Sequence, residues 1–310
     1  MENQKSFYTI RTYQTMINKL QREFFNNKPL TPDSLIKYRT DIIKYITKLK
    51  SLNTQHTLLL SVINYLKENN TTHADYYTSL LNIKNKIRIK NNNELVNPSK
   101  KDTDRYIPIE KIFELKEKYR HALLPEFSLN DIKFIMLSLY SNNDLPPLRS
   151  QDYYNCKIAN DITEMNNDIN KSSHNYILLT EKLFVRNTGK TFKNHGQRFI
   201  EIPDQLITDI KNFQQKSNSQ WLIPSPVNVN NHIEQAHFSK LLTRTLKSEF
   251  GHGFSSSYFR KMRVSTEISN IIKEYPKYEQ ANQRMKNLSK DMGHSTDIQQ
   301  LIYAKLKSII

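Results

Sequence analysis

Four short segments hold the side chains best suited to chemistry, and all four lie beside predicted turns or helix starts. Arg149 lies in PPLRSQDY, Lys190 in TGKT and Arg260 in SSSYFRKMR. The fourth segment, DMGHSTDIQQLIYAK, holds His294 and Tyr303. Each segment alone has a structural explanation: a helix start, a solvated turn, a basic helix face, and a helix cap before an amphipathic helix. Together, cationic side chains can stabilise an anionic centre that a tyrosine hydroxyl attacks.

Other kinds of catalytic site find little support in the sequence. Nine histidines and one cysteine form no ligand pairs at zinc-finger or metalloprotease spacing. Three of the scattered carboxylates could converge to hold magnesium, but nothing selects which three. No P-loop, GxGxxG turn or GxSxG elbow occurs. An enzyme built on this chain is therefore expected to work without a metal, a nucleotide cofactor or a thiol.

The charge of the chain predicts a polyanionic partner. Lys and Arg total 46 against 30 Asp and Glu, a formal net charge of +16. Nucleic acid is the simplest such partner, and a membrane surface is less favoured because no long basic amphipathic stretch dominates. No apolar run could span a bilayer, and the N-terminus lacks the apolar core of a signal peptide. The single cysteine, Cys156, excludes an internal disulfide and fits a reducing intracellular compartment.

The first part of the chain is predicted to be a small, basic, all-helical unit. Apolar residues recur every three to four positions over 6–28, and Thr31-Pro-Asp-Ser is typical of the start of a second helix. Two more helices are expected at about 53–68 and 73–90. The polar stretch 88–106 favours a linker, so we predict a helical domain over 1–90, a linker over 91–106 and a second domain over 107–310.

The second part is predicted to combine helices with a small antiparallel sheet. Residues 175–203 alternate apolar and polar positions, with Gly189 and Gly196 as turn residues. Helices are expected over 107–121, 128–142, 204–216, 235–249, 255–273 and 277–291, with one more in the segment that holds His294 and Tyr303. The predicted fold class is mainly α with a small antiparallel β-sheet, an α+β chain.

The four segments, taken in order, resemble the tyrosine recombinase (phage integrase) family. The resemblance covers about 107–310, and the helical N-terminal unit more loosely. It rests on PPLRSQDY, NTGKTFKNHGQRFIEIP, YFRKMRVS and MGHSTDIQQLIY, of which the last is the most specific. The forms PP-R-x-x-DY and MGHS-x4-Q-x2-Y look most like the subgroup carried by large DNA viruses and their mobile elements. The resemblance implies a helical core-binding domain followed by a catalytic domain.

The resemblance also implies a role for each residue of the set. Tyr303 would be the nucleophile that forms a 3′-phosphotyrosine link with DNA. Arg149 and Arg260 would stabilise the negative charge of the phosphorane transition state. Lys190 would be the general acid for the departing 5′ oxygen, with Lys193 as its local rival. His294 would hydrogen-bond the scissile phosphate, and no cofactor would be needed.

One position departs from the family pattern. The family usually has a histidine or lysine three residues before the second arginine, and here that residue is Ser257, which cannot accept a proton at neutral pH. His252 or Lys261 could compensate. Asp152 is expected either to support the arginine segment as a partner or simply to cap a helix.

The resemblance implies double-stranded DNA as the partner, a homotetramer on DNA, and access to DNA in the host nucleus or in a viral factory in the cytoplasm. The function favoured is site-specific integration or excision of a viral or mobile element. A telomere resolvase or type IB topoisomerase-like enzyme would use the same nucleophile. A non-catalytic DNA-binding protein on a recombinase scaffold and a magnesium-dependent nuclease or transposase are the remaining alternatives.

Overall fold

The computed structural model describes residues 7–96, 100–142, 145–189, 192, 196–274 and 278–291. The chain divides into two compact units, unit 1 (Met1–Asn93) and unit 2 (Glu94–Ile310). Among the described helices, none is both long enough and apolar enough to cross a membrane.

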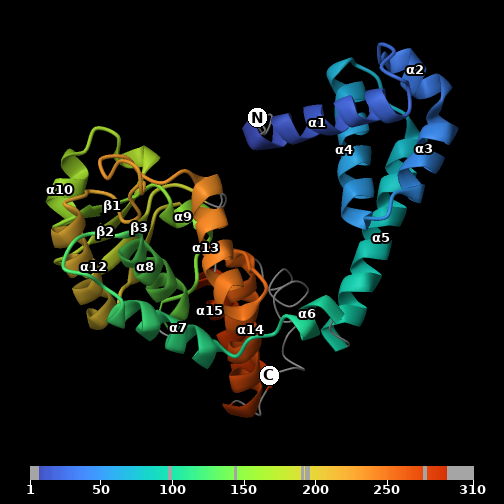
Figure 1. Ribbon diagram of the computed structural model, residues 1–310. Coiled ribbons are helices and arrows are strands. Elements are labelled where there is room, and N and C mark those ends of the chain that lie inside the picture. Colours follow the sequence, from blue (N-terminus) through green and yellow to red (C-terminus); the bar gives the residue numbers. More distant parts are fainter. Residues whose placement is uncertain are drawn as a thin grey trace. The chain divides into compact units, whose positions relative to one another are not determined.

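The described elements of unit 1 are all helices (Figure 1). Its helices are α1 (Phe7–Glu23), α2 (Pro32–Lys37), α3 (Arg39–Lys48), α4 (Leu52–Glu68) and the first part of α5 (Ala74–Val96). The core lies where α1 packs on α4, with fully buried side chains that include Leu20, Leu59 and Val62. Burial of each such side chain stabilises the unit by about 1.5–3 kcal/mol.

The helix ends of unit 1 follow from local chemistry. Thr31 caps α2 through a capping box with Ser34, as the Thr-Pro-Asp-Ser segment predicts. The helix predicted over 6–28 ends earlier, because Asn26 and Asn27 take the left-handed conformation. The helix predicted to follow Thr31 is split into α2 and α3 at Tyr38.

The stretch interpreted as a linker contains more helix than its composition suggests. Helix α5 continues to Val96, and a short helix, α6, covers Lys100–Asp104. The division between the compact units falls within α5, after Asn93. The limits of the helical domain, 1–90, and of the catalytic domain, 107–310, therefore stay predictions.

Unit 2 surrounds a small sheet with helices (Figure 1). Its elements after α6 are α7 (Ile109–His121), α8 (Leu129–Ser141), α9 (Ser150–Tyr153), β1 (Cys156–Ala159), α10 (Ile162–Asn167), η1 (Lys171–Ser173), β2 (Asn175–Leu178), β3 (Leu183–Arg186), β4 (Arg198–Glu201), α12 (Asp204–Ser217), α13 (Gln235–Phe250), α14 (Ser256–Glu274) and α15 (Tyr278–Asp291). The six helices predicted between residues 107 and 291 agree with α7, α8, α12, α13, α14 and α15 to within a few residues. The helix predicted in the segment with His294 and Tyr303 lies outside the described residues.

The sheet has the order β1-β2-β3-β4. β2, β3 and β4 form the predicted antiparallel part, but β1 pairs in parallel with β2. The mainly helical α+β fold is thus confirmed, and the part of the sheet predicted over 175–203 is antiparallel. The sheet as a whole is mixed, because the unpredicted strand β1 adds a parallel pair. The run CKIA was missed because a four-residue apolar strand has no measurable period, and its parallel partner is reached only through the α10 crossover.

Helix α8 is the central element of the unit 2 core. It is buried on nearly every side and packs against α7, α12 and α13, as expected for a helix that is apolar all round. Near its end, the Tyr140 ring stacks on Phe259 of α14 at a centroid distance of 4.8 Å and meets Tyr153 of α9 edge-on at 5.6 Å. These ring contacts bring the α9 and α14 segments together.

Candidate active site

Arg149 stands at the start of α9, directly after the proline-rich turn. Its backbone N–H donates to Asp152 Oδ2 at 3.0 Å, so Asp152 closes the first turn of the short helix. The Asp152 carboxylate is fully buried, and its Oδ1 lies 3.3 Å from Arg186 Nη2. Asp152 therefore caps α9 and also pairs with an arginine from another element.

Arg260 reaches the same place from α14. Its side chain is 1% exposed, and its Nη1 donates to the carbonyl oxygen of Pro147 at 3.1 Å. Pro147 lies in the turn that leads into Arg149. The two arginines that lie far apart in the sequence are thus joined through the backbone beside α9. The interpretation of Arg260 as part of an exposed basic helix face is wrong, because the side chain is buried.

Asp152 is the electrostatic centre of this arginine cluster. Burial raises the pKa of the Asp152 carboxyl, while the nearby positive charges of Arg186, Arg149 and Arg260 act to lower it. The positive charges of three arginines thus act on one buried carboxylate, and Arg186 pairs with it directly. We call Arg149, Asp152, Arg186 and Arg260 the arginine centre.

Arg186 is the member of the arginine centre that the sequence analysis missed. It is the last residue of β3 and is 2% exposed. Alternation along a strand places Arg186 on the same face as Phe184, which is fully buried. An arginine at an inward position of an apolar strand, just before a turn, is the signal that could have revealed it.

The loop after β3 packs tightly on the arginine centre at Gly189. A Cβ atom on Gly189 would lie 2.6 Å from Asp152 Oδ1 and 3.1 Å from Arg186 Nη2, and its φ of +130° also favours glycine. The segment that leads to Lys190 therefore passes directly against Asp152. Lys190 and Lys193 themselves lie outside the described residues.

Ser257 occupies the position where the tyrosine recombinase family usually has a histidine or lysine. The surroundings of this position are polar and partly exposed. Ser257 is exposed near the start of α14, with its Oγ 2.6 Å from Ser255 Oγ. His252 is half-buried, and its ring meets Phe254 at a centroid distance of 5.0 Å. Its Nε2 is buried, and within the described part of the chain it has no hydrogen-bond partner.

The last segment of the predicted set, with His294 and Tyr303, also lies outside the described residues. The structure therefore brings together Arg149, Asp152, Arg260 and the approach to Lys190, and it adds Arg186. The roles of the nucleophile and of the phosphate-binding histidine stay predictions. Within the described ranges, no group of His, Cys, Asp and Glu side chains could hold a metal ion.

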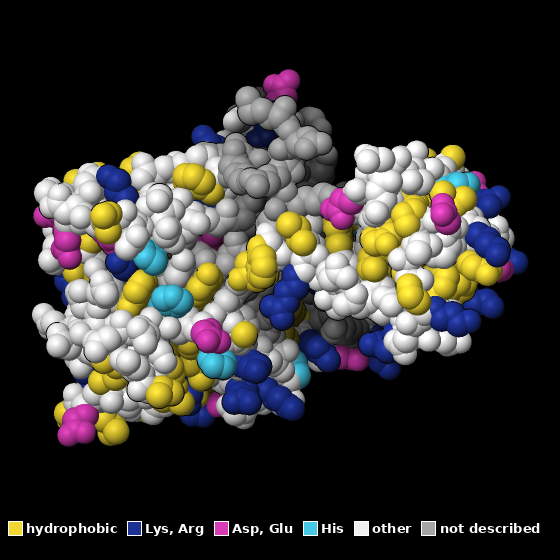
Figure 2. All heavy atoms as spheres, turned by 90° about the horizontal axis from the view of Figure 1, so that it is seen from above, with side chains coloured by type: hydrophobic (Ala, Val, Ile, Leu, Met, Phe, Trp, Pro, Cys, Tyr) yellow, Lys and Arg dark blue, Asp and Glu magenta, His cyan; other side chains and the backbone are white. Residues whose placement is uncertain are grey.

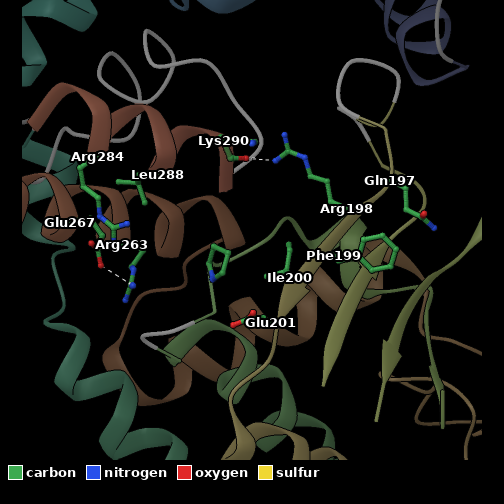
Figure 3. Close-up of a pocket in the computed structure, with 11 residues that line it drawn as sticks. Gln197, Arg198, Phe199, Ile200, Glu201, Arg263, Glu267, Arg284, Leu288 and Lys290 are labelled. Carbon is green, nitrogen blue, oxygen red and sulfur yellow. Dashed lines mark hydrogen bonds and ion pairs between the residues drawn. The ribbon is translucent and has the colours of Figure 1, made fainter. Parts of the chain in front are cut away.

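A groove of about 680 Å³ opens between β4 and the helix pair α14–α15 (Figure 3). Its lining residues are Pro146, Gln197, Arg198, Phe199, Ile200, Glu201, Arg263, Glu267, Arg284, Leu288 and Lys290. Four of these are basic and two are acidic. Arg263 pairs with Glu267 at 2.8 Å, and Arg198 donates to the backbone carbonyl of Lys290. We call this the β4–α15 groove.

Comparisons with known proteins add little to this description. No protein-family model matches the chain, and no curated protein matches it. The solved structures to which the chain is similar include one described as the crystal structure of XerA recombinase, at 13% identity and a TM-score of 0.43. That similarity covers 99% of this chain and 92% of the other. At this level the similarity carries no functional argument, and the proposal below rests on the residues of this chain.

Proposed function

We propose that the chain is a tyrosine-type DNA strand transferase that acts as a site-specific recombinase. The observation that carries the proposal is the arginine centre. Arg149 donates its backbone N–H to the buried Asp152 carboxylate, and Arg260 bonds to Pro147 in the turn before Arg149, so both charges act on that carboxylate. The loop toward Lys190 packs on the same carboxylate through Gly189. The segments with Arg149 and Arg260, and the part of the third segment that leads toward Lys190, therefore lie close together, which supports the proposal.

The chemistry follows from the residue types. The Tyr303 hydroxyl oxygen attacks the phosphorus, its proton is released to water, and the bond from phosphorus to the 5′ oxygen breaks. Lys190 donates a proton to that 5′ oxygen. The product is a 3′-phosphotyrosine, which keeps the bond energy for rejoining. Fixed guanidinium groups stabilise the extra negative charge of the phosphorane, and Arg149, which is only half-buried, is best placed to face the phosphate.

The charge of the chain supports DNA as the substrate. The net charge is +16, and Lys and Arg side chains gather along an edge of unit 1 in Figure 2. Such side chains contact phosphates and position a protein on a duplex without reading its sequence. Integration or excision of a viral or mobile element, by a homotetramer on double-stranded DNA, is the form of the reaction that we propose.

The test is covalent trapping on DNA in the presence of EDTA. Nicked duplexes made from the DNA that flanks this coding sequence would be incubated with the full chain and resolved on a denaturing gel. We expect an adduct of protein and DNA that forms without divalent metal and disappears in Tyr303→Phe. Tyr8→Phe is the matched control, because Tyr8 is exposed on α1 and should leave the adduct unchanged.

Two other outcomes would redirect the assignment. Binding without an adduct would favour the non-catalytic DNA-binding protein, an alternative that the near-complete burial of Arg260 itself supports. Strand cleavage that requires magnesium and leaves no protein-linked strand would favour a nuclease. If an adduct forms, hairpin ends or relaxed supercoils instead of exchanged strands would identify a telomere resolvase or a topoisomerase-like enzyme.

A further inference from the structure

Asn175, the first residue of β2, joins the two segments that meet at the arginine centre. Its Oδ1 accepts hydrogen bonds from the backbone N–H groups of Asn187 and Thr188, each at 2.9 Å. Its Nδ2 donates to the backbone carbonyl of Asp152 at 2.8 Å. Two N–H donors need an oxygen and a carbonyl needs a donor, so these contacts determine which way the side-chain amide points.

The same loop is braced from its other end. Asn187 Oδ1 accepts from Gln197 Nε2 at 2.6 Å, just before β4 begins. Asn187 Nδ2 donates to the backbone carbonyl of Lys171 at 3.1 Å. The side chains of Asn175 and Asn187 therefore hold both bases of the β3–β4 loop, and the loop's path past Gly189 is set before it reaches Lys190.

We propose that Asn175 is a positioning residue, which holds the lysine-bearing β3–β4 loop in register with the arginine centre. This inference rests on the proposed function, because it treats Lys190 as the general acid. Asn175 is completely buried and cannot touch DNA itself. It acts through the backbone of Asp152 on one side and the backbone of Asn187 and Thr188 on the other.

A purely structural role would look different in one respect. Buried polar groups are normally hydrogen-bonded, so the bonds of a buried asparagine can simply reflect good packing within a sheet. Here the bonds of one side chain run to the segment with Arg149 and to the segment with Lys190, and to no third place among the described residues. Loss of Asn175 should therefore change the placement of the lysine relative to the arginines more than it changes the fold.

The experiment separates proton donation from the rest of catalysis. Asn175→Ala would be compared with the wild type in the covalent trapping assay on nicked duplexes. One duplex carries the natural 5′ oxygen at the scissile phosphate, and the other carries sulfur in place of that oxygen. When the bond from phosphorus to sulfur breaks, the thiolate leaves without needing a proton. Cleavage at oxygen should slow by at least about tenfold, with the 10²–10⁴-fold contribution of general acid catalysis as the upper limit, while cleavage at sulfur should change by less than about threefold.

Two further variants control for stability and divide the network. Ile177→Val lies in the same strand, removes one buried methylene and leaves every bond of Asn175 in place, so both substrates should react as in the wild type. Asn175→Asp keeps an acceptor for the two loop N–H groups and loses the donor to Asp152. It should keep the amides of Asn187 and Thr188 protected from exchange and still be slow at oxygen, because the link to the arginine segment is lost.

Amide hydrogen exchange of the full chain without DNA gives a second, independent readout. In Asn175→Ala the amides of Asn187 and Thr188 should exchange at least about tenfold faster, because their acceptor is gone, whereas in Ile177→Val they should not. Equal slowing at oxygen and sulfur, or unchanged protection of these amides, overturns the proposal. If the wild type forms no adduct, the proposed function fails, and the exchange result alone then decides whether Asn175 holds the loop.

Discussion

The buried pair of Arg186 and Asp152 gives a direct test of the arginine centre. Arg186→Met removes one partner and keeps most of the side-chain volume. At 3.3 Å and an effective dielectric constant of about 20, the attraction between unit charges is about 5 kcal/mol. Removal of one partner from a buried pair costs about 3–5 kcal/mol, because the other charge stays buried without it. Such a loss is a large part of the 5–15 kcal/mol that stabilises an ordinary domain.

The assay is urea unfolding followed by tryptophan fluorescence. Trp221 is the only tryptophan of the chain and lies in unit 2, largely buried, so its signal reports this unit alone. Lys182→Met is the matched control. Lys182 pairs with Asp204 at 2.6 Å, but both side chains are exposed, and such pairs contribute about 0–1 kcal/mol.

The expected result is a loss of about 3–5 kcal/mol in the free energy of unfolding for Arg186→Met and less than about 1 kcal/mol for Lys182→Met. Equal, small losses in the two variants would refute the reasoning, since Arg186 would then be no more important than a surface lysine. Asp152→Asn in the Arg186→Met background should cost less than the sum of the two single changes, because the two side chains are in contact.

Three more predictions concern Gly189, Asp168 and Arg284. Gly189→Ala should lower the free energy of unfolding of unit 2 by about 1–3 kcal/mol and slow adduct formation, because a Cβ there meets the Asp152 carboxylate and φ is positive. Although burial raises it, hydrogen bonds from Lys157 and Tyr176 hold the pKa of Asp168 well below its usual range. This stabilisation is present above the unfolded pKa of about 4 and is lost as the pH falls below that value. Asp168→Asn should therefore reduce the fall in the urea midpoint of unfolding at acid pH, measured by unfolding over a series of pH values. Arg284→Gln in the β4–α15 groove should weaken DNA binding and reduce the salt slope of log affinity by about 1, whereas an unchanged slope in a filter-binding titration would place the groove away from the DNA.

Much of the helical scaffold could be predicted because its signals are local. The Thr31 capping box and the Ser128 N-cap with Asp131 are read from residues three positions apart, and both form as such patterns predict. Apolar periodicity places each long helix because a helix repeats every 3.6 residues, wherever it lies in the fold. The order of the four family-like segments is likewise a property of the chain itself.

The arginine centre could be predicted only in part. Arg149 and Arg260 stood out because they lie in recognisable segments, but those segments do not show that the Arg260 side chain is buried. Arg186 and Asn175 were missed because each has its partner on a different element. Asp152, which binds both of them, comes to β2 and β3 only through the crossover of β1 and α10.

The sequence by itself determined the helical character of both units, the charge that favours a polyanion, and the residue types available for metal-free attack on a phosphodiester. Tertiary structure alone decided that β1 joins the sheet in parallel, that Arg260 is buried against Pro147, and that the charges of three arginines act on one buried carboxylate. The physical reason is that helix caps and periodicity depend on neighbours in the sequence. The energy of a buried charge depends instead on which distant groups the fold places within a few ångströms of it.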